Sequence, residues 1–389
     1  MTERLYYSDS YLTEFTAKVS AVDGARVFLD RSAFYPTSGG QPHDVGELAG
    51  AGVVDVVDED AHIVHVLSSQ APFAVGVEVT GRVDWARRFD FMQQHTGQHL
   101  LSAVFEDLFG HKTVSVHFGD HYSTLDLDAE SLATEAAVRA ERRANTVVFE
   151  NRPVIVGFED GATATGLRKP ADRSGEIRIV TIGGLDRSAC GGTHVRSTGE
   201  IGPVMVRRVE KYKKLSRIEF RCGWRALARS RADVEALSAM AETMSAAIDE
   251  LPTLVSKQVA GLQASDSARR RLSEEVARFR VRALYDSAPP DGGGVRRIVE
   301  RSATMDELRA MGQAVSTLPK AVFIGATASP PAVVFAASED SGVNAGAVLK
   351  GALAAQGGRG GGSPRVAQGT VADAAALEEI VRELLKAED

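Results

Sequence analysis

The chain has 389 residues, enough for roughly two to four domains, and its 44% hydrophobic and 25% charged residues are typical of a globular protein. The formal net charge of −7 argues against nucleic-acid binding through bulk positive charge, so any such contact must come from local basic patches. The sequence shows no apolar run long enough to span a bilayer and no signal peptide, and Cys190 and Cys222 are too few for a disulfide scaffold. We therefore expect a cytoplasmic protein with no membrane partner.

The sequence predicts an α+β protein of several domains that begins with a small β-barrel at residues 1–88. Apolar and polar residues alternate here over short stretches, which are separated by tight turns such as Asp23-Gly24. A glycine-bearing loop occupies residues 34–41. The predicted strands are residues 15–19, 27–29, 53–57, 62–67 and 75–83.

Residues 89–225 are predicted to form a mixed α+β domain. From Phe89 to about Leu108 the apolar residues recur every three or four positions, which is typical of a helix. A second helix is predicted over residues 130–144. The predicted strands of this domain are residues 113–116, 123–127, 177–182 and 204–209.

Residues 226–288 are predicted to form a helical hairpin. Their apolar residues follow a heptad seam that Pro252 interrupts, and such a seam can pair within one chain or between two, so both a monomer and a homodimer are open. The alternative is a helical linker packed on a neighbouring domain. Residues 289–389 are predicted to form a separate α/β domain. Its expected elements are strands at 321–324 and 333–336, a glycine-rich loop at 357–364 and a helix over 373–386.

Two pairs of residues have the side chains and the spacing of metal ligands. His95 and His99 are four apart on the predicted helix, so both imidazoles project from one face. Cys190 and His194 are also four apart, and the glycines between them allow a turn tight enough for both side chains to reach one ion. Nitrogen and thiolate ligands in a tetrahedral set select zinc over magnesium or calcium. We therefore predict one Zn²⁺ that is held by these four residues. The residue after His95 is Thr96 rather than glutamate, which argues against a zincin-type protease.

Several motifs resemble one known family. The segments 95–101, 190–194 and 198–202 look like the editing domain shared by alanyl-tRNA synthetases and the free-standing AlaX editing proteins. The loop at 34–41 resembles the glycine-rich motif of the barrel that precedes that domain. Residues 358–369 resemble the DHHA1-like domain shared by alanyl-tRNA synthetases and DHH-type phosphoesterases. The order of the motifs is similar to that of the long AlaX class.

This resemblance implies a trans-editing hydrolase that maintains the fidelity of translation. Members of the family hydrolyse Ser-tRNA(Ala) and, in some cases, Gly-tRNA(Ala), because a pocket for alanine cannot strongly exclude either amino acid. The resemblance therefore implies a zinc-dependent aminoacyl-tRNA deacylase, with mischarged tRNA(Ala) as its partner. The synthetases of this family are also ligases that bind ATP, but no segment of this chain looks like an ATP-binding synthetase core.

Further candidate residues surround the predicted site. Thr96 and Gln98 on the helix, together with Ser38 and Gln41 in the glycine-rich motif, are expected to contact the substrate, although Thr96 could instead cap or pack within the helix. His117 lies where the synthetases carry a substrate-facing glutamine, and it is expected to face the pocket. The alternative for His117 is a surface or packed histidine.

Two segments are candidates for contact with tRNA phosphates. The first is a basic run in an otherwise acidic chain, and its alternative is a solvated charged face. Arg87 and Arg88 form a second basic candidate. In the C-terminal glycine-rich loop, backbone N–H groups at Gly360 and Gly361 could cradle a phosphate, unless the loop is only a flexible turn. The residues that we select from the basic run are Arg207, Lys211, Lys213 and Lys214.

Other functions stay open at this point. A tRNA-binding protein with a structural zinc would carry the same ligands. A phosphoesterase similar to the DHH proteins would need an Asp-His-His sequence and clustered aspartates for two metals, which we do not find. Editing of another mischarged tRNA is a further alternative, because threonyl-tRNA synthetases share a related editing fold.

Overall fold

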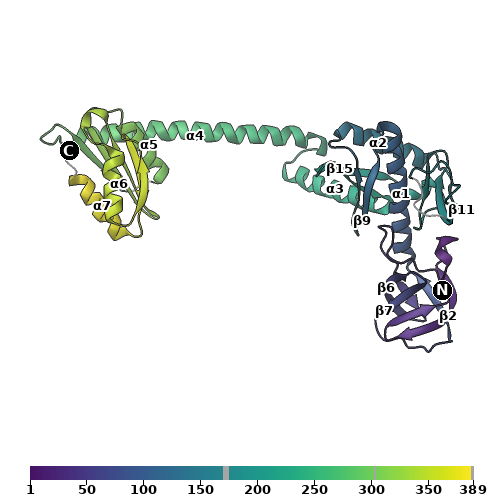
Figure 1. Ribbon diagram of the computed structural model, residues 1–389. Coiled ribbons are helices and arrows are strands. Elements are labelled where there is room, and N and C mark those ends of the chain that lie inside the picture. Colours follow the sequence, from purple (N-terminus) through teal and green to yellow (C-terminus); the bar gives the residue numbers. More distant parts are fainter. Residues whose placement is uncertain (170–174, 302–303, 387–389) are drawn as a thin grey trace. The chain divides into compact units, whose positions relative to one another are not determined.

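The computed structural model describes residues 1–169, 175–301 and 304–386 (Figure 1). Two compact units divide the chain between Met240 and Ala241. This division falls inside the segment 226–288, for which the sequence predicts a helical hairpin. In the described ranges, no helix is long and apolar enough to cross a membrane.

The N-terminal part of the first unit is a closed barrel. Its core consists of buried side chains such as Val19, Val27, Leu29 and Ile63, in agreement with the alternating pattern of the sequence. Beside the barrel strands, β1 (Glu3–Arg4) pairs in parallel with β4 (Arg31–Ser32). The barrel strands, in the order in which they pair, are β2 (Glu14–Asp23), β3 (Arg26–Leu29), β7 (His62–Leu67), β6 (Ala51–Glu59), β5 (Gly46–Leu48) and β8 (Glu78–Val83).

Helix α1 (Trp85–Phe109) follows the barrel directly (Figure 1). It begins earlier than predicted because the Asp84 carboxylate accepts a hydrogen bond of 3.1 Å from the backbone N–H of Arg87 and so caps the helix. Arg88 is fully buried, and its Nε lies 3.0 Å from both carboxylate oxygens of Asp44. The prediction that Arg88 contacts phosphate is therefore wrong, because its charge is neutralised inside the protein.

Two antiparallel sheets complete the first unit, and both contact α1. Among the described residues, these sheets contain three strands that the sequence did not predict, namely β11 (Val154–Asp160), β13 (Asp186–Ala189) and β15 (Leu215–Cys222). In β15, Ile218, Phe220 and Cys222 are buried while the residues between them are charged, so the charge of the segment concealed a period of two. The first sheet has the order β14 (Val204–Tyr212), β15 (Leu215–Cys222), β10 (Ser123–Leu127) and β9 (Thr113–Phe118). The second sheet has the order β11 (Val154–Asp160), β12 (Glu176–Ile182) and β13 (Asp186–Ala189), and the remaining helices of the unit are α2 (Thr134–Phe149) and α3 (Gly223–Thr243).

The second unit is an α/β domain with helices on both faces of one sheet. Helix α5 and the C-terminal end of α4 cover Phe323 and Val334, whereas α6 and α7 cover Ile324 and Phe335 on the opposite face. The strands, in the order in which they pair, are β16 (Arg296–Glu300), β17 (Ala321–Ala328), β18 (Pro331–Ala337), β20 (Val366–Thr370) and β19 (Arg359–Gly362). The helices are α4 (Leu251–Ser287), α5 (Met305–Val315), α6 (Ala345–Ala355) and α7 (Ala374–Lys386).

Helices α3 and α4 occupy the segment of the predicted hairpin. Pro252 lies in the first turn of α4, as predicted, and α4 then continues as one helix (Figure 1). Apolar residues of the predicted seam, such as Leu237 on α3 and Leu262 on α4, are exposed. The antiparallel pairing of the two helices stays a prediction.

The glycine-rich loop predicted over 357–364 is wrong for its central residues. Residues 359–362 form strand β19, which pairs antiparallel with β20. A Cβ atom on Gly360 would lie 2.3 Å from the carbonyl oxygen of Gln368, whereas one on Gly361 would meet nothing within 4 Å. Gly360 therefore allows the close approach of two strands, rather than the flexibility of a loop.

Candidate metal centre

The four predicted ligands meet in one cluster. His95 and His99 project from α1, Cys190 follows β13, and His194 lies in the turn after it. Their ligand atoms all lie within 4.8 Å of one another. The Sγ of Cys190 lies 3.4 Å from Nε2 of His95 and 3.3 Å from Nε2 of His194. The sequence spacing thus identified a group of residues that the fold brings together.

The electrostatics of the cluster favour a thiolate at Cys190. Burial raises the pKa of this thiol, but His95 and His194 lower it by more, so that the pKa lies well below its usual value. A thiolate is the form in which cysteine binds a metal. The donor set and its charge state therefore fit a zinc ion, with three imidazole nitrogens and one sulfur.

Each of the three histidines has a partner for its other ring nitrogen. Nδ1 of His95 donates to Oε1 of Gln41 at 2.8 Å, and Nδ1 of His99 donates to Oδ2 of Asp186 at 2.8 Å. Nδ1 of His194 lies 3.1 Å from Oγ1 of Thr96. A neutral ring whose proton is on Nδ1 binds a metal through Nε2, so these contacts orient the rings for that role.

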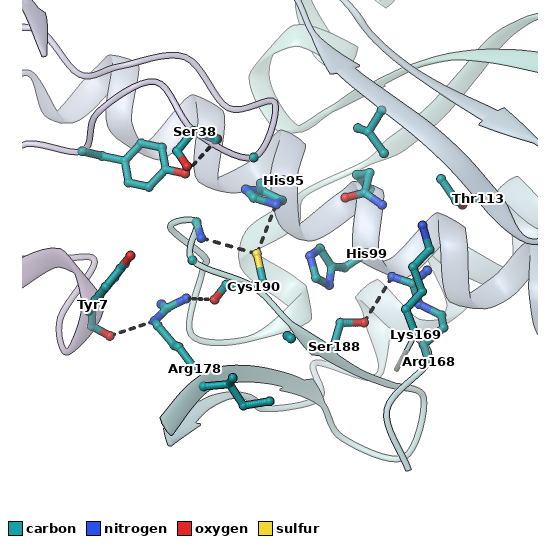
Figure 2. A pocket seen from close by; sticks show the side chains of 18 of the residues that line it. Tyr7, Ser38, His95, His99, Thr113, Arg168, Lys169, Arg178, Ser188 and Cys190 are labelled. Carbon is teal, nitrogen blue, oxygen red and sulfur yellow. Dashed lines mark hydrogen bonds between the residues drawn. The ribbon is translucent and has the colours of Figure 1, made fainter. Parts of the chain in front are cut away.

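Three of the four candidate ligands, His95, His99 and Cys190, line a cavity of about 740 Å³ (Figure 2). Its wall combines residues of the barrel region with residues of the two sheets and α1. Arg168, Lys169 and Arg178 bring positive charge to it, and Glu176 brings one carboxylate. The lining residues used below are Tyr7, Ser38, His95, Gln98, His99 and Cys190.

Arg178 holds the backbone of Cys190 from both sides. Its carbonyl oxygen accepts a bond of 3.0 Å from the N–H of Cys190, and its Nη1 donates to the carbonyl oxygen of Cys190 at 2.6 Å. Its Nε donates to the carbonyl oxygen of Tyr7 at 3.0 Å (Figure 2). Arg178 therefore connects the N-terminal segment to the loop that carries the sulfur.

The structure divides the predicted substrate residues into two groups. Ser38 and Gln98 line the cavity. Gln41 and Thr96 are fully buried and bind the rings of His95 and His194 instead. The expectation that Gln41 and Thr96 contact the substrate is therefore corrected, because their polar atoms are used by the ligand side chains.

The prediction that His117 faces the pocket is wrong. His117 is exposed on β9, and it does not occur among the described residues that line the cavity. Its neighbour Val116 lines the cavity, and the ring of Phe118 lies 5.0 Å from that of His95. Because side chains alternate along a strand, His117 points to the opposite face of the sheet.

Most cations of the basic run, counted over residues 207–221, are paired with carboxylates. Arg207 binds Asp233 at 2.5 Å, and Lys211 lies 3.6 Å from Glu130. The neighbouring arginines 208, 217 and 221 pair with Glu210, Asp126 and Glu219. Lys213 and Lys214, at the turn between β14 and β15, make no ion pair with any residue that the structure describes. Within the described part of the chain no carboxylate neutralises these two lysines, although Nζ of Lys213 lies 5.2 Å from the ring centroid of Tyr212.

Sequence reasoning missed Asp186, which binds both His99 and Arg168. Burial raises the pKa of the Asp186 carboxyl, but His99 and Arg168 lower it by more, to about 2. A signal was present, since Asp186 and Ser188 share a face of β13 and Cys190, directly after the strand, continues the same alternation. Arg178 and Tyr7 gave no comparable signal, because their partners lie far away in sequence.

Comparison with known proteins gives three family matches along the chain. The class II (A) tRNA synthetase family matches residues 7–87, which include the barrel. The second additional domain of threonyl and alanyl tRNA synthetases matches residues 177–219. The DHHA1 domain matches residues 292–387 in the second unit.

Individual relatives agree with these matches. Alanine–tRNA ligase of Pyrococcus abyssi is 30% identical over 99% of this chain, but the match covers 43% of the ligase, so the chain spans less than half of that protein. Alanyl-tRNA editing protein Aarsd1 of Bos taurus is 36% identical over 53% of this chain and 47% of its own length. Alanyl-tRNA editing protein AlaX-L of Pyrococcus horikoshii is 33% identical, and the match covers 95% of each chain. The chain therefore belongs to the AlaX-L family of alanyl-tRNA editing proteins.

Proposed function

We propose that this chain is a zinc-dependent aminoacyl-tRNA deacylase that acts in trans on mischarged tRNA(Ala), chiefly Ser-tRNA(Ala) and also Gly-tRNA(Ala). The observation that carries the proposal is the cluster of His95, His99, Cys190 and His194, of which all but His194 line a large cavity, in a chain that belongs to an editing family. Hydrolysis of the wrong ester supplies the discrimination that an alanine pocket cannot reach by binding alone.

The cavity supports a substrate larger than a free amino acid. A volume of about 740 Å³ accommodates an aminoacyl group together with the terminal nucleoside to which it is esterified. Gln98 lines the cavity from α1, and because its Nε2 donates to Oγ of Ser102 at 2.8 Å, we assign the contact with the aminoacyl group to its Oε1. Ser38 approaches from the barrel loop. Lys169 and Arg178 add positive charge that suits the backbone of the acceptor end.

The four ligands would hold Zn²⁺, which supplies a Lewis acid for the ester carbonyl or for a water. The chain's own residues keep this centre in order. Asp186 and Thr96 fix the rings of His99 and His194, and Arg178 fixes the backbone of Cys190. Burial of the three histidines excludes bulk water from their side of the cavity.

We assign contact with the body of the tRNA to separate surfaces. Lys213 and Lys214 are the first choice, because they are not neutralised by carboxylates within the described residues. Arg207 and Lys211 would have to exchange an intramolecular partner for a phosphate. In the second unit, we retain the backbone at Gly360 and Gly361, on the edge strand β19, as a phosphate contact. We propose no ligase or ATP-dependent reaction.

A panel of aminoacyl-tRNAs tests the proposal. The full chain loaded with zinc should release serine from Ser-tRNA(Ala) quickly and glycine from Gly-tRNA(Ala) more slowly, while Ala-tRNA(Ala) is largely spared. Equal rates on all three, or no release from any, would contradict it. Faster release from a mischarged threonine tRNA would assign the chain to another editing reaction.

A second candidate function is tRNA binding around a structural zinc. It is favoured by the ligand set itself, because four protein ligands fill a tetrahedral shell as they do in structural sites. The same panel separates the two functions. Binding of Ser-tRNA(Ala) by the zinc-loaded chain without release of serine would support the structural role.

A further inference from the structure

Gln41 is a buried glutamine of the barrel loop whose amide faces the metal centre. The residue is 0% exposed, although it follows a stretch of exposed chain at residues 37–40. Its Oε1 accepts from Nδ1 of His95 at 2.8 Å and from the backbone N–H of Thr193 at 3.2 Å. Its Nε2 donates to Oγ1 of Thr193 at 2.8 Å. The amide thus joins the barrel loop to one metal ligand and to the residue before another.

Glycines make this approach sterically possible. Gly39 and Gly40 have φ values of 57° and 85°, a region that side chains with a Cβ rarely adopt, and they turn the chain so that Gln41 points inward. On the other side, a Cβ on Gly192 would lie 2.2 Å from Cε1 of His95 and 3.1 Å from Oε1 of Gln41. The close packing of the loop against the ligand turn therefore depends on glycine on both sides.

We propose that Gln41 is a positioning residue through which the barrel sets the metal affinity of the centre. Its carbonyl oxygen holds the proton of His95 on Nδ1, fixes the plane of the ring, and so directs Nε2 toward the sulfur of Cys190. Gln41 contributes no ligand atom, and both ends of its amide are already hydrogen-bonded, which leaves it unsuited to bind the substrate. This inference rests on the ligand set of the proposed function but not on hydrolysis.

A second buried glutamine provides a matched control, which distinguishes the positioning of His95 from a general contribution to packing. Gln94, on α1, is also 0% exposed. Its amide is used just as fully, since Oε1 accepts from the N–H of Cys222 at 2.9 Å and Nε2 donates to the carbonyl oxygen of Cys222 at 3.0 Å. None of these contacts involves a metal ligand. Replacing Gln94 therefore removes comparable hydrogen bonds without touching His95.

The test measures zinc affinity of the full chain by competition with a chromophoric chelator, together with the visible spectrum of the Co²⁺-loaded protein. Gln41→Ala should weaken zinc binding by about 10–100-fold, as the loss of a partner behind a ligating histidine typically does, and should change the Co²⁺ bands. Gln41→Glu keeps an acceptor for His95 and should stay within a few-fold of the wild type. Gln94→Ala should lower the free energy of unfolding but leave zinc affinity and Co²⁺ bands unchanged.

Several results would overturn the proposal. They are wild-type affinity in Gln41→Ala, an equal loss of affinity in Gln94→Ala, and the absence of zinc binding by the wild-type chain. If Gln41→Ala does not fold, Gln41→Met and Gln41→Glu decide the matter, because both keep the length of the side chain and only the second keeps the acceptor. Equal zinc affinity in these two variants would also overturn it. A chain that shows the expected affinities but hydrolyses no aminoacyl-tRNA would contradict the proposed function alone.

Discussion

The Oδ2 atom of Asp186 lies 2.8 Å from Nδ1 of His99, and the other oxygen of the same carboxylate accepts from Nε of Arg168 at 2.8 Å. One buried carboxylate thus accepts a hydrogen bond from a histidine of the candidate metal centre and another from Arg168 at the cavity wall. The arrangement fixes His99 with its Nε2 free, and it links the position of Arg168 to that of a metal ligand.

We expect Asp186→Asn to lower zinc affinity by about 10–100-fold, because an amide oxygen accepts more weakly than a carboxylate and the amide N–H group would face one of the donors His99, Arg168 and Ser188. Chelator competition on the full chain measures this. Asp126→Asn is the matched control, since Asp126 binds Arg217 and Ser115 away from the ligands. Equal zinc affinity in Asp186→Asn and wild type would remove Asp186 from the centre.

Replacement of Cys190 should remove metal and activity together. Cys190→Ala deletes the sulfur that lies beside two histidines, so we expect zinc content and deacylation of Ser-tRNA(Ala) to fall in parallel. Cys222→Ala serves as the control, because Cys222 is fully buried and outside the ligand cluster. Elemental analysis that found full zinc in Cys190→Ala would exclude Cys190 as a ligand.

Gly97, between the two histidines of α1, is expected to tolerate no larger residue. A Cβ at this position would lie 2.2 Å from Sγ of Cys222, so Gly97→Ala should destabilise the protein by about 1–3 kcal/mol through overpacking. Urea unfolding measures the change. In the double variant with Cys222→Ala the clashing sulfur is gone, and most of the lost stability should return. Additive losses in the double variant would show that the contact is not the cause.

His65 should make the stability of the barrel depend on pH. It is fully buried, with Nδ1 3.2 Å from the carbonyl oxygen of Val27 and Nε2 2.7 Å from Oγ of Ser32, and burial lowers its pKa to about 4 while the bond to Val27 opposes this. Because the folded pKa lies below the unfolded value of about 6.5, the neutral ring stabilises the fold above pH 6.5. About 3 kcal/mol of stability should be lost as the pH falls toward 4.

Urea unfolding of the wild type and of His65→Gln between pH 7.5 and pH 4 measures this contribution. The variant carries no proton at this position, so its stability should fall less over the same range. His121→Gln, at an exposed position, is the control and should follow the wild type. Parallel pH profiles for wild type and His65→Gln would contradict the prediction.

The basic run should contribute to tRNA binding through its two unpaired lysines. Lys213→Ala and Lys214→Ala should each weaken binding and reduce the slope of log affinity against log salt concentration by about 1, as the loss of one phosphate contact does. Arg208→Ala removes a cation that already lies 3.1 Å from Glu210, so its effect should be smaller. Binding titrations at several salt concentrations distinguish these cases, and an equal effect of all three variants would contradict the assignment.

The sequence predicted that the four candidate ligands cluster, because each pair of them is close together in the sequence. Two pairs, each with a spacing of four, were sufficient to propose the cluster of His95, His99, Cys190 and His194. The residues that support the ligands were not predictable in the same way, since Gln41 and Asp186 reach their histidines across 54 and 87 positions of the chain. The prediction that His117 faces the pocket was wrong for a simpler reason. It followed from the position of His117 in a motif, whereas the alternation of side chains along β9 decides which face the ring occupies.

Elements were predicted with similar limits. Alternation predicts five of the six barrel strands, because the barrel core buries every second residue, whereas the three residues of β5 are too few to show the pattern. The charged residues of β15 obscure its alternation in the sequence. The glycines at residues 359–362 predict a loop, because glycine is depleted in strands, but here they permit the close packing of two strands.

The hydrogen bond between Gln41 and His95 also has a thermodynamic counterpart. Coupling between two equilibria is reciprocal, so any factor by which the docked barrel loop tightens metal binding is also the factor by which bound metal tightens the docking of that loop. Removal of the ion should therefore loosen the docking of residues 39–41, although these residues provide no ligand atom. Their backbone amides should exchange hydrogen faster in the chelated protein than in the loaded one, while amides at the opposite end of the barrel keep their rates.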